Sequence, residues 1–269
     1  WDDDMDGDGI ADGVLIAGGE GRQEDPIFIS DNSGGGYVSW RSYLNDPVYG
    51  ELYAQHIDSG GNLTLSSAQL ISGDIKVQID SQQNMCSDRD GGVYVTWYED
   101  AGAGDGNYYG SHMDANGNFV GPILLIETVE NYGNVSLESA GNGAAVIAWK
   151  EGPNEQENIY SQRIHVDYNN GTIDKLWNLG NSLEVCTATG TQTSPKVTYY
   201  SDEYVVVVWE DRRSTDYAIG GNFIDSFGNL IFSSDADLVY TTNSSSPLFP
   251  RVKATSNAAF VVWLSAEDV

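Results

Sequence analysis

The sequence predicts an all-β fold, a β-propeller made of four-stranded antiparallel blades of about 55 residues, because two landmarks share one period. The first is a short apolar run that ends in tryptophan and recurs every 52 to 60 residues, at Trp40, Trp97, Trp149, Trp209 and Trp263. The second is a turn rich in Asp, Gly and Asn, in residues 58–63, 114–119, 167–173 and 225–230. Turns of this chemistry join antiparallel strands, so both landmarks indicate repeated hairpin-built sheets.

Each unit divides into four expected strands. The first is a short segment near a proline or a polar residue, in 26–29, 83–86, 134–137, 195–198 and 250–253. The second is the tryptophan-ended run, which is apolar on both faces and is therefore expected between two layers. The third occupies 52–58, 108–114, 159–164 and 218–225, and the fourth follows the hairpin turn. The propeller is thus expected to span 13–269, with units at about 26–75, 82–128, 134–187 and 195–243 and a partial unit at 250–269.

The number of units leaves the closure of the ring open. Four units are complete, the fifth has two strands, and Gly13–Ala17 is expected to be the last strand of a preceding unit. The chain is either a piece of a longer propeller or array, or a ring of five closed by pairing of its two ends. The missing third strand of the last unit favours the first alternative.

Residues 1–12 form a separate acidic segment. Asp4, Asp6, Asp8 and Asp12 alternate around a glycine, as an oxygen-ligand cage for Ca²⁺ requires. An EF-hand would place its bidentate glutamate where this chain has Leu15, so the loop instead resembles a thrombospondin type 3 or dockerin-type calcium loop. We expect a structural Ca²⁺ ion there; the alternative is a disordered acidic leader.

The composition restricts the partners. A formal net charge of −28 excludes nucleic-acid backbone, which requires a basic surface. No run of about 18 apolar residues is present, so no membrane span is expected. Cys86 and Cys186 fall at different places in the repeat, which favours two buried thiols over a disulfide. The expected partners are a surface glycan or protein, or further copies of the chain.

The fourth unit carries a family resemblance. Cys186–Pro195, Trp209–Arg213 and Ile224–Asn229 resemble a repeat of secreted bacterial cell-surface proteins, with the pattern W-x-D-x-R followed by Y-A-Q-R-I-D-x-x-G. Tyr53–Asp58 and Trp177–Gly180 match further parts of that repeat. The resemblance implies propellers with binding or adhesive roles at an extracellular or cell-surface location, and it implies no catalytic set.

Candidate binding residues follow the tryptophan-ended strands. The loops from second to third strand vary most in length, and variable loops on a rigid scaffold commonly carry binding. Their acids Glu99, Asp100, Glu151 and Asp211 could serve a glycosidase, which needs two carboxylates, but acids at repeated positions more often cap turns and pair with neighbours.

Aromatic side chains offer a second set of candidates. The tryptophans are expected to pack between blades, whereas Tyr43, Tyr49 and Tyr108 are candidate platforms for a sugar ring. The histidines recur two residues before the hairpin aspartates, at His56, His112 and His165. A catalytic base is unique and oriented by partners, so this recurrence favours strand-surface positions.

The sequence therefore favours an extracellular, non-enzymatic module for binding, adhesion or surface assembly. A carbohydrate-binding, lectin-like propeller is one alternative. A glycoside hydrolase that uses the loop carboxylates is the other.

Overall fold

The protein is a stack of antiparallel sheets, seen in a computed structural model that describes residues 13–18, 21–45, 49–75, 77, 83–102, 105–128, 133–213, 217–233, 237–241, 245–255 and 257–267. The first sheet holds β1 (Gln23–Ser30), β2 (Gly36–Ser42), β3 (Glu51–Ile57) and β4 (Gln69–Leu70). The second holds β5 (Asn84–Ser87), β6 (Gly92–Gly102), β7 (Asp105–Asp114) and β8 (Phe119–Thr128). The third holds β9 (Gly133–Gly141), β10 (Ala144–Glu151), β11 (Asn158–Asp167) and β12 (Thr172–Lys175).

Two further sheets complete the stack. β13 (Leu183–Cys186) also pairs with β11 after the 3-10 turn η1 (Asn178–Gly180). The fourth sheet holds β14 (Thr191–Ser201), β15 (Tyr204–Arg212), β16 (Ala218–Asp225) and β17 (Asp237–Thr241). The fifth holds β18 (Ser245–Ala254) and β19 (Ala259–Glu267). Strands pair antiparallel in sequence order within each sheet, which confirms the predicted all-β architecture of four-stranded antiparallel blades.

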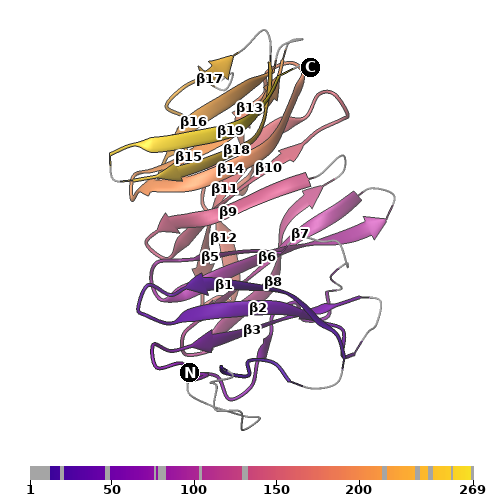
Figure 1. The fold of residues 1–269 in the computed structure, drawn as a ribbon, viewed down its shortest axis with the longest axis vertical. Coiled ribbons are helices and arrows are strands. Elements are labelled where there is room, and N and C mark those ends of the chain that lie inside the picture. Colours follow the sequence, from indigo (N-terminus) through magenta and orange to yellow (C-terminus); the bar gives the residue numbers. More distant parts are fainter. Residues whose placement is uncertain are drawn as a thin grey trace.

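The sheets pack face to face, and the tryptophan-ended strands supply the apolar layers between them. Trp97 lies between the first and second sheets, Trp149 between the second and third, and Trp209 between the third and fourth. All three indoles are at most 2% exposed, which confirms their predicted packing role. In Figure 1 the sheets follow one another from the indigo first sheet at the bottom to the yellow β19 near the top. Successive inner strands β1, β5, β9, β14 and β18 are neighbours.

The two ends of the stack differ from the prediction. Residues 13–18 contain no strand in the structure; Ile16 and Ala17 instead pack against Trp40 on the outer face of the first sheet. Within the described residues, no strand of the first sheet pairs with the fifth, and the two sheets lie at opposite ends in Figure 1, so a closed ring is not shown. On β19, Phe260, Val262 and Leu264 alternate at 60–65% exposure.

Because consecutive strands are joined as hairpins, the loops and turns lie at two opposite ends of the stack. We call the end with the β2–β3, β6–β7, β10–β11 and β15–β16 loops the connection face, because the links between sheets also lie there. The opposite end, with the β1–β2, β5–β6, β9–β10 and β14–β15 turns, is the turn face. The hairpin aspartates behave as predicted: Asp58 Oδ1 accepts hydrogen bonds of 2.8 Å from the backbone N–H groups of Gly60 and Asn62.

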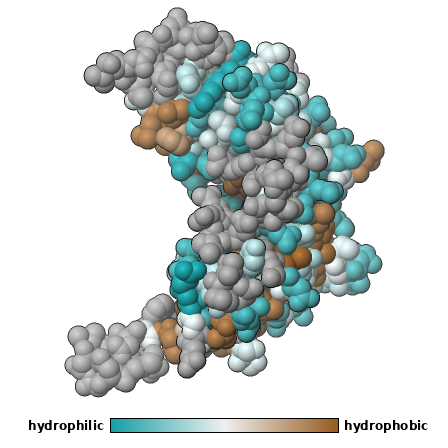
Figure 2. Space-filling model, turned by 90° about the vertical axis from the view of Figure 1, so that its right-hand side faces the viewer, coloured by the Kyte–Doolittle hydropathy of each residue, from teal (hydrophilic) through white to brown (hydrophobic). Residues whose placement is uncertain are grey.

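Surface chemistry agrees with the composition. Figure 2 shows hydrophilic residues over most of the coloured surface on that side, with hydrophobic residues confined to patches. Cys86 and Cys186 are buried free thiols, as expected. The described residues include no helix with the length and apolarity needed to cross a membrane.

Candidate functional site

Three of the five inner strands, β1, β14 and β18, have a strained bulge near their start, on the connection face. Asp25, Ser194 and Phe249 have positive φ angles of 51°, 54° and 55°, and each directly precedes a proline. The register of β1, β14 and β18 shifts at these points. Left-handed backbone is strained at residues other than glycine. β-bulges redirect side chains, and they are frequent at the rims of barrels and beside active sites. The start of these three inner strands is therefore where the fold stores strain.

Asp25 is the charged member of this set, and a buried arginine fixes its carboxylate. Arg41 Nη1 lies 3.3 Å from Asp25 Oδ2, and the Arg41 side chain is 1% exposed while that of Asp25 is 59% exposed. Gln83 donates a short hydrogen bond from Nε2 to the backbone oxygen of Asp25, and accepts one of 3.0 Å from the hydroxyl of Ser39. The carboxylate of Asp25 is thus exposed to solvent, while Arg41 and Gln83 hold the residue in one orientation.

Tyr43 lies beside Arg41, and Glu99 lies on the second sheet, on the face turned toward the first sheet. Arg41 Nη1 donates to the Tyr43 hydroxyl at 3.3 Å. Alternate residues of β2 face the second sheet, since Tyr37 belongs to the layer between the first two sheets and Ser39 contacts Gln83. Trp97 belongs to the same layer, so Glu99, two residues further along β6, points from the second sheet toward the side that carries Arg41.

This arrangement offers two carboxylates on facing sheets. Asp25 is mostly exposed and Glu99 is half-buried, beside Tyr109. Burial raises the pKa of Tyr109 first, and the charge of Glu99 and a hydrogen bond to it raise the pKa further. The Tyr109 phenol therefore remains a donor to Glu99 at neutral pH. Two carboxylates, a guanidinium and phenols are a set that can protonate a leaving oxygen and activate a water.

Other predicted acids have structural partners. Trp209 Nε1 donates to Asp211 Oδ2 at 3.1 Å, and Asp211 has no exposed surface. Trp149 Nε1 likewise donates to Glu151 Oε2 at 3.1 Å. The acid two residues after the tryptophan thus satisfies its buried indole N–H in the third and fourth sheets. A ligand contact by Asp211 or Glu151 stays a prediction. The backbone of Asp100 lies in β6, and its side chain is outside the described part.

The predicted tyrosine platforms differ in accessibility. Tyr43 is 5% exposed, and Arg22 lies over its ring at 4.0 Å. Tyr108 is 6% exposed and packs against Tyr98, between the second and third sheets. Tyr49 is 38% exposed. Of the three rings, Tyr49 alone has an exposed side chain that a sugar could reach without rearrangement.

Two histidines contradict the expected surface position. His56 and His112 are 5% and 2% exposed, and their Nε2 atoms lie 3.0 Å and 2.8 Å from carboxylate oxygens of Asp31 and Asp88. Both pairs lie on the turn face, beneath the rings of tyrosines from β2 and β6. The prediction erred because a short polar turn with an inward aspartate can bury a histidine that alternation alone places outside. His165 is partly exposed.

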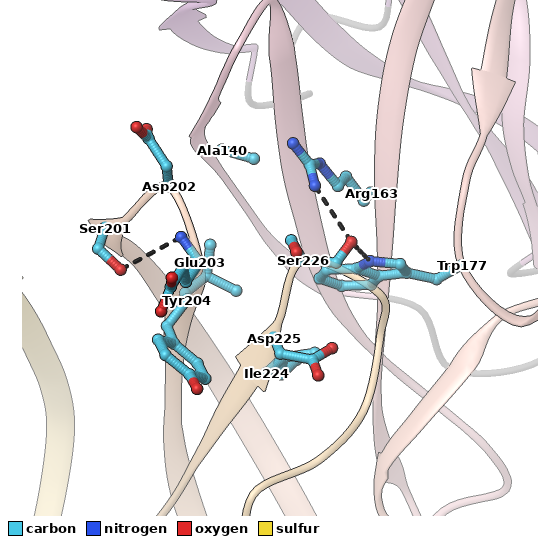
Figure 3. Close-up of a pocket in the computed structure, with 11 residues that line it drawn as sticks. Ala140, Arg163, Trp177, Ser201, Asp202, Glu203, Tyr204, Ile224, Asp225 and Ser226 are labelled. Atoms are coloured by element: carbon cyan, nitrogen blue, oxygen red, sulfur yellow. Dashed lines mark hydrogen bonds between the residues drawn. The ribbon is translucent and has the colours of Figure 1, made fainter.

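Three of the cavities lined by described residues differ in size and place. The one in Figure 3, between the third and fourth sheets, has a volume of about 10 Å³, which is room for one water molecule. In it Arg163 and Trp177 both donate to the backbone oxygen of Ser226 at 3.1 Å. A cavity of about 380 Å³ lies on the connection face, lined by side chains that include Gln156, Asn158 and Thr187. A third, of about 440 Å³, lies on the turn face.

The predicted calcium ligands Asp4, Asp6, Asp8 and Asp12 lie outside the described residues. Among the described residues no cluster of three or more His, Cys, Asp or Glu side chains could hold a metal ion. The calcium site stays a prediction.

Comparison with known proteins identifies similar folds at low identity. No family model matches the chain, and no curated protein matches it. The Hadza microbial sialidase Hz136 is 12% identical, with a TM-score of 0.47 over 84% of this chain and 50% of that one. The polysaccharide lyase Uly1 is 11% identical, with a TM-score of 0.49 over 90% and 55%. The endo-arabinase from Bacteroides thetaiotaomicron VPI-5482 is 14% identical, with a TM-score of 0.39 over 91% and 94%.

These comparisons correct the functional expectation. The chain spans 50–57% of the length of the first three solved structures it matches. The structures named here are carbohydrate-active enzymes, and none is named as an adhesin or an assembly module. The expectations of a non-enzymatic binding, adhesion or surface-assembly module and of no enzymatic activity were therefore wrong and are withdrawn. The likeness itself concerns the fold, so any activity has to be argued from this chain's own residues.

Sequence reasoning named Tyr43 and Glu99 but missed Asp25, Arg41 and Gln83. The usable signal was the carboxylate that directly precedes Pro26 at the start of an inner strand, together with a basic residue directly after Trp40. Neither signal reveals the ion pair, because the burial of Arg41 depends on the folded packing around it.

Proposed function

We propose that the chain forms the glycan-binding and catalytic part of an extracellular carbohydrate-active enzyme, a glycoside hydrolase with its site on the connection face between the first two sheets. The observation that carries the proposal is Asp25, whose exposed carboxylate is fixed at a strained bulge by the fully buried Arg41. Taking the Arg41 guanidinium out of water is costly, and here the buried guanidinium fixes the orientation of a carboxylate that stays open to solvent.

Glu99 would supply the second carboxylate. Hydrolysis of a glycosidic bond needs one carboxylic acid to protonate the leaving oxygen, and one carboxylate to activate a water or attack the anomeric carbon. Asp25 and Glu99 project from facing sheets at the same end of the stack, and Arg41 lies beside Asp25. The arrangement supports this division of labour, and the buried hydroxyl of Tyr43 accepts a hydrogen bond from Arg41 and so helps to hold the guanidinium beside Asp25.

The connection face also offers polar groups suited to a neutral sugar chain. The cavity of about 380 Å³ is lined by amide and hydroxyl side chains from the β10–β11 loop and residues 187–190. Such groups donate and accept hydrogen bonds with sugar hydroxyls. An extracellular location follows from the proposal, because polymeric glycans are encountered outside the cell.

The test is hydrolysis of a panel of plant, algal and bacterial polysaccharides, followed as the release of reducing ends. Asp25→Asn and Glu99→Gln should each lower kcat about a hundredfold or more while the protein stays folded. Asp174→Asn is the matched control, since Asp174 is an exposed carboxylate on β12, remote from the site. Turnover that survives both substitutions together would refute the proposal, as would wild-type protein that cleaves no member of the panel.

A further inference from the structure

The cavity of about 440 Å³ on the turn face brings together residues from three sheets. Arg89 comes from the β5–β6 turn of the second sheet, Tyr199 and Asp202 from the end of β14 and its turn, and Lys253 from β18 of the fifth sheet. These residues meet only because the inner strands curve around a common axis. The cavity lies on the face opposite Asp25, so it is separate from the site proposed above.

Arg89 presents a flat guanidinium at one wall of this cavity. Its Cζ atom lies 3.9 Å from the centre of the Tyr199 ring, and its backbone is left-handed with a φ of 62°. The Tyr199 hydroxyl donates to Asp202 Oδ1 at 2.5 Å. Burial, and then the hydrogen bond to Asp202, raise the pKa of Tyr199, so its phenol stays protonated and holds the ring in place. A stacked guanidinium keeps its N–H groups in one plane, which suits a two-oxygen acceptor.

Lys253 supplies a second cation at the opposite wall. Its side chain is 79% exposed, and Nζ lies 3.4 Å from Glu138 Oε2 of the third sheet. An ammonium group has three N–H donors, so this one contact leaves donors for a ligand.

The charge in this region is balanced, in contrast to the strongly negative charge of the whole chain. The sequence has 12 Lys and Arg against 40 Asp and Glu. The described lining nevertheless holds two cations and one carboxylate, which already accepts the Tyr199 phenol, and Glu138 adds a second carboxylate beside Lys253. Lys196 on β14 and Arg251 on β18 lie on the same inner strands, where burial and then the charge of Arg251 lower the pKa of Lys196 and the charge of Glu210 raises it. At physiological salt, charges beyond about 8 Å are largely screened, so this local balance decides what binds.

We propose that this cavity binds the carboxylate of a uronate unit in an acidic polysaccharide, with the Arg89 fork on its two oxygens and Lys253 on a flanking oxygen. The volume accommodates a sugar ring, and the walls supply donors for its hydroxyls as well as for its carboxylate. The inference rests on the proposed function for the polymeric nature of its ligand. It adds an anchoring site that holds the polymer on the face remote from the reacting bond.

The experiment is calorimetric titration of the full chain with oligogalacturonate and with the same oligomer after methyl esterification, which removes the charge and keeps the backbone. We expect binding of the acid form and none of the ester. Arg89→Asn, which tolerates positive φ, and Lys253→Gln should each weaken binding about tenfold. Lys175→Gln, which removes an exposed charge on β12, is the matched control and should leave the affinity unchanged.

The outcomes separate the two proposals. Equal binding of acid and ester, or affinity unchanged in Arg89→Asn and Lys253→Gln, would overturn the uronate site. Inorganic sulfate that binds as tightly as the oligomer would also overturn it, because the cavity would then recognise a bare anion. Asp25→Asn should retain the affinity for oligogalacturonate. If no glycan is hydrolysed but binding that depends on Arg89 persists, the catalytic proposal fails and the anchoring site stands.

Discussion

Trp209 and Asp211 form one buried unit: the indole Nε1 donates a 3.1 Å hydrogen bond to Asp211 Oδ2, and neither side chain has exposed surface. Arg213 closes the unit, with Nη2 at 2.5 Å from the same oxygen. The spacing W-x-D-x-R therefore has a physical reason. Alternate residues of one strand share a face, so the acid reaches both the indole before it and the guanidinium after it.

Asp211→Ala should destabilise the protein by about 3 kcal/mol, because it leaves a buried indole N–H without its acceptor and removes the carboxylate that pairs with Arg213. Urea unfolding followed by tryptophan fluorescence measures the change. Glu203→Ala, at an exposed residue in the β14–β15 turn, is the control and should change stability little. A loss for Asp211→Ala as small as that of the control would show that the unit contributes no stability.

Trp209 also differs from the other strand-ending tryptophans in its neighbour across the sheet. Trp40, Trp97 and Trp149 stack on Tyr53, Tyr109 and Tyr160 with ring centroids 6.0–6.2 Å apart. Trp209 instead faces Gly220, where an added Cβ would lie 2.5 Å from the indole ring. In the first three sheets a tyrosine ring occupies the position that Gly220 has in the fourth sheet. The Trp209 indole therefore packs directly on the backbone of Gly220.

Gly220→Ala should therefore cost about 1–3 kcal/mol through overpacking, although alanine is otherwise acceptable in a strand. The midpoint of urea unfolding gives the value. Gly18→Ala is the control, because its added methyl group meets only the end of the Leu15 side chain, at 3.2 Å. A Gly220→Ala protein as stable as wild type would mean that the Trp209 ring shifts freely.

The repeat could be predicted from sequence because each unit's core is encoded locally. A run such as Tyr204 to Trp209 is apolar on both faces, and the structure buries it on both faces. The hairpin aspartates act on their own turns, so their roles also follow from nearby residues. Local chemistry was therefore sufficient for the apolar strands and for these turns.

The site could not be predicted in the same way, because its contacts depend on strand register within a sheet and on packing between sheets. Gln83 reaches Asp25 across 58 positions of sequence, and Arg41 reaches it from β2 of the same sheet. A residue that precedes proline usually has extended backbone, so the left-handed bulge at Asp25 could not be predicted from the local sequence. His56 was expected on the surface for a related reason: its partner Asp31 lies 25 positions away, in the β1–β2 turn of the same sheet.

The Asp31–His56 pair gives a pH dependence with a defined sign. Burial raises the pKa of Asp31, but hydrogen bonds from Ser33, His56 and Gly35 outweigh it and lower that pKa from 3.8 to about 2. Because the folded-state pKa lies below the unfolded value, the stabilisation is fully present above 3.8 and is lost as the pH falls toward 2.

Asp31→Asn should therefore lower the melting temperature near neutral pH, and the difference from wild type should shrink as the pH falls from about 4 to about 2. Thermal unfolding at a series of pH values measures it. Asp174→Asn controls for the general loss of a carboxylate. A difference that stays constant down to pH 2 would assign the effect of Asp31→Asn to lost hydrogen bonds alone.

The acidic residues Asp4, Asp6, Asp8 and Asp12 predict that Ca²⁺ stabilises the N-terminal segment. A ligand that binds only the folded state stabilises it by about 2.7 kcal/mol at a hundredfold excess over its Kd, so adding Ca²⁺ should raise the melting temperature or slow proteolysis within residues 1–13. EDTA should reverse either effect. Mg²⁺ should substitute poorly, because a loop with several carboxylates suits the larger, more flexible coordination of Ca²⁺.

Asp6→Asn together with Asp8→Asn should abolish the response to Ca²⁺, whereas Asp174→Asn should retain it. If wild-type and substituted proteins melt and are cleaved alike in Ca²⁺ and in EDTA, the segment is an acidic leader that binds no structural ion.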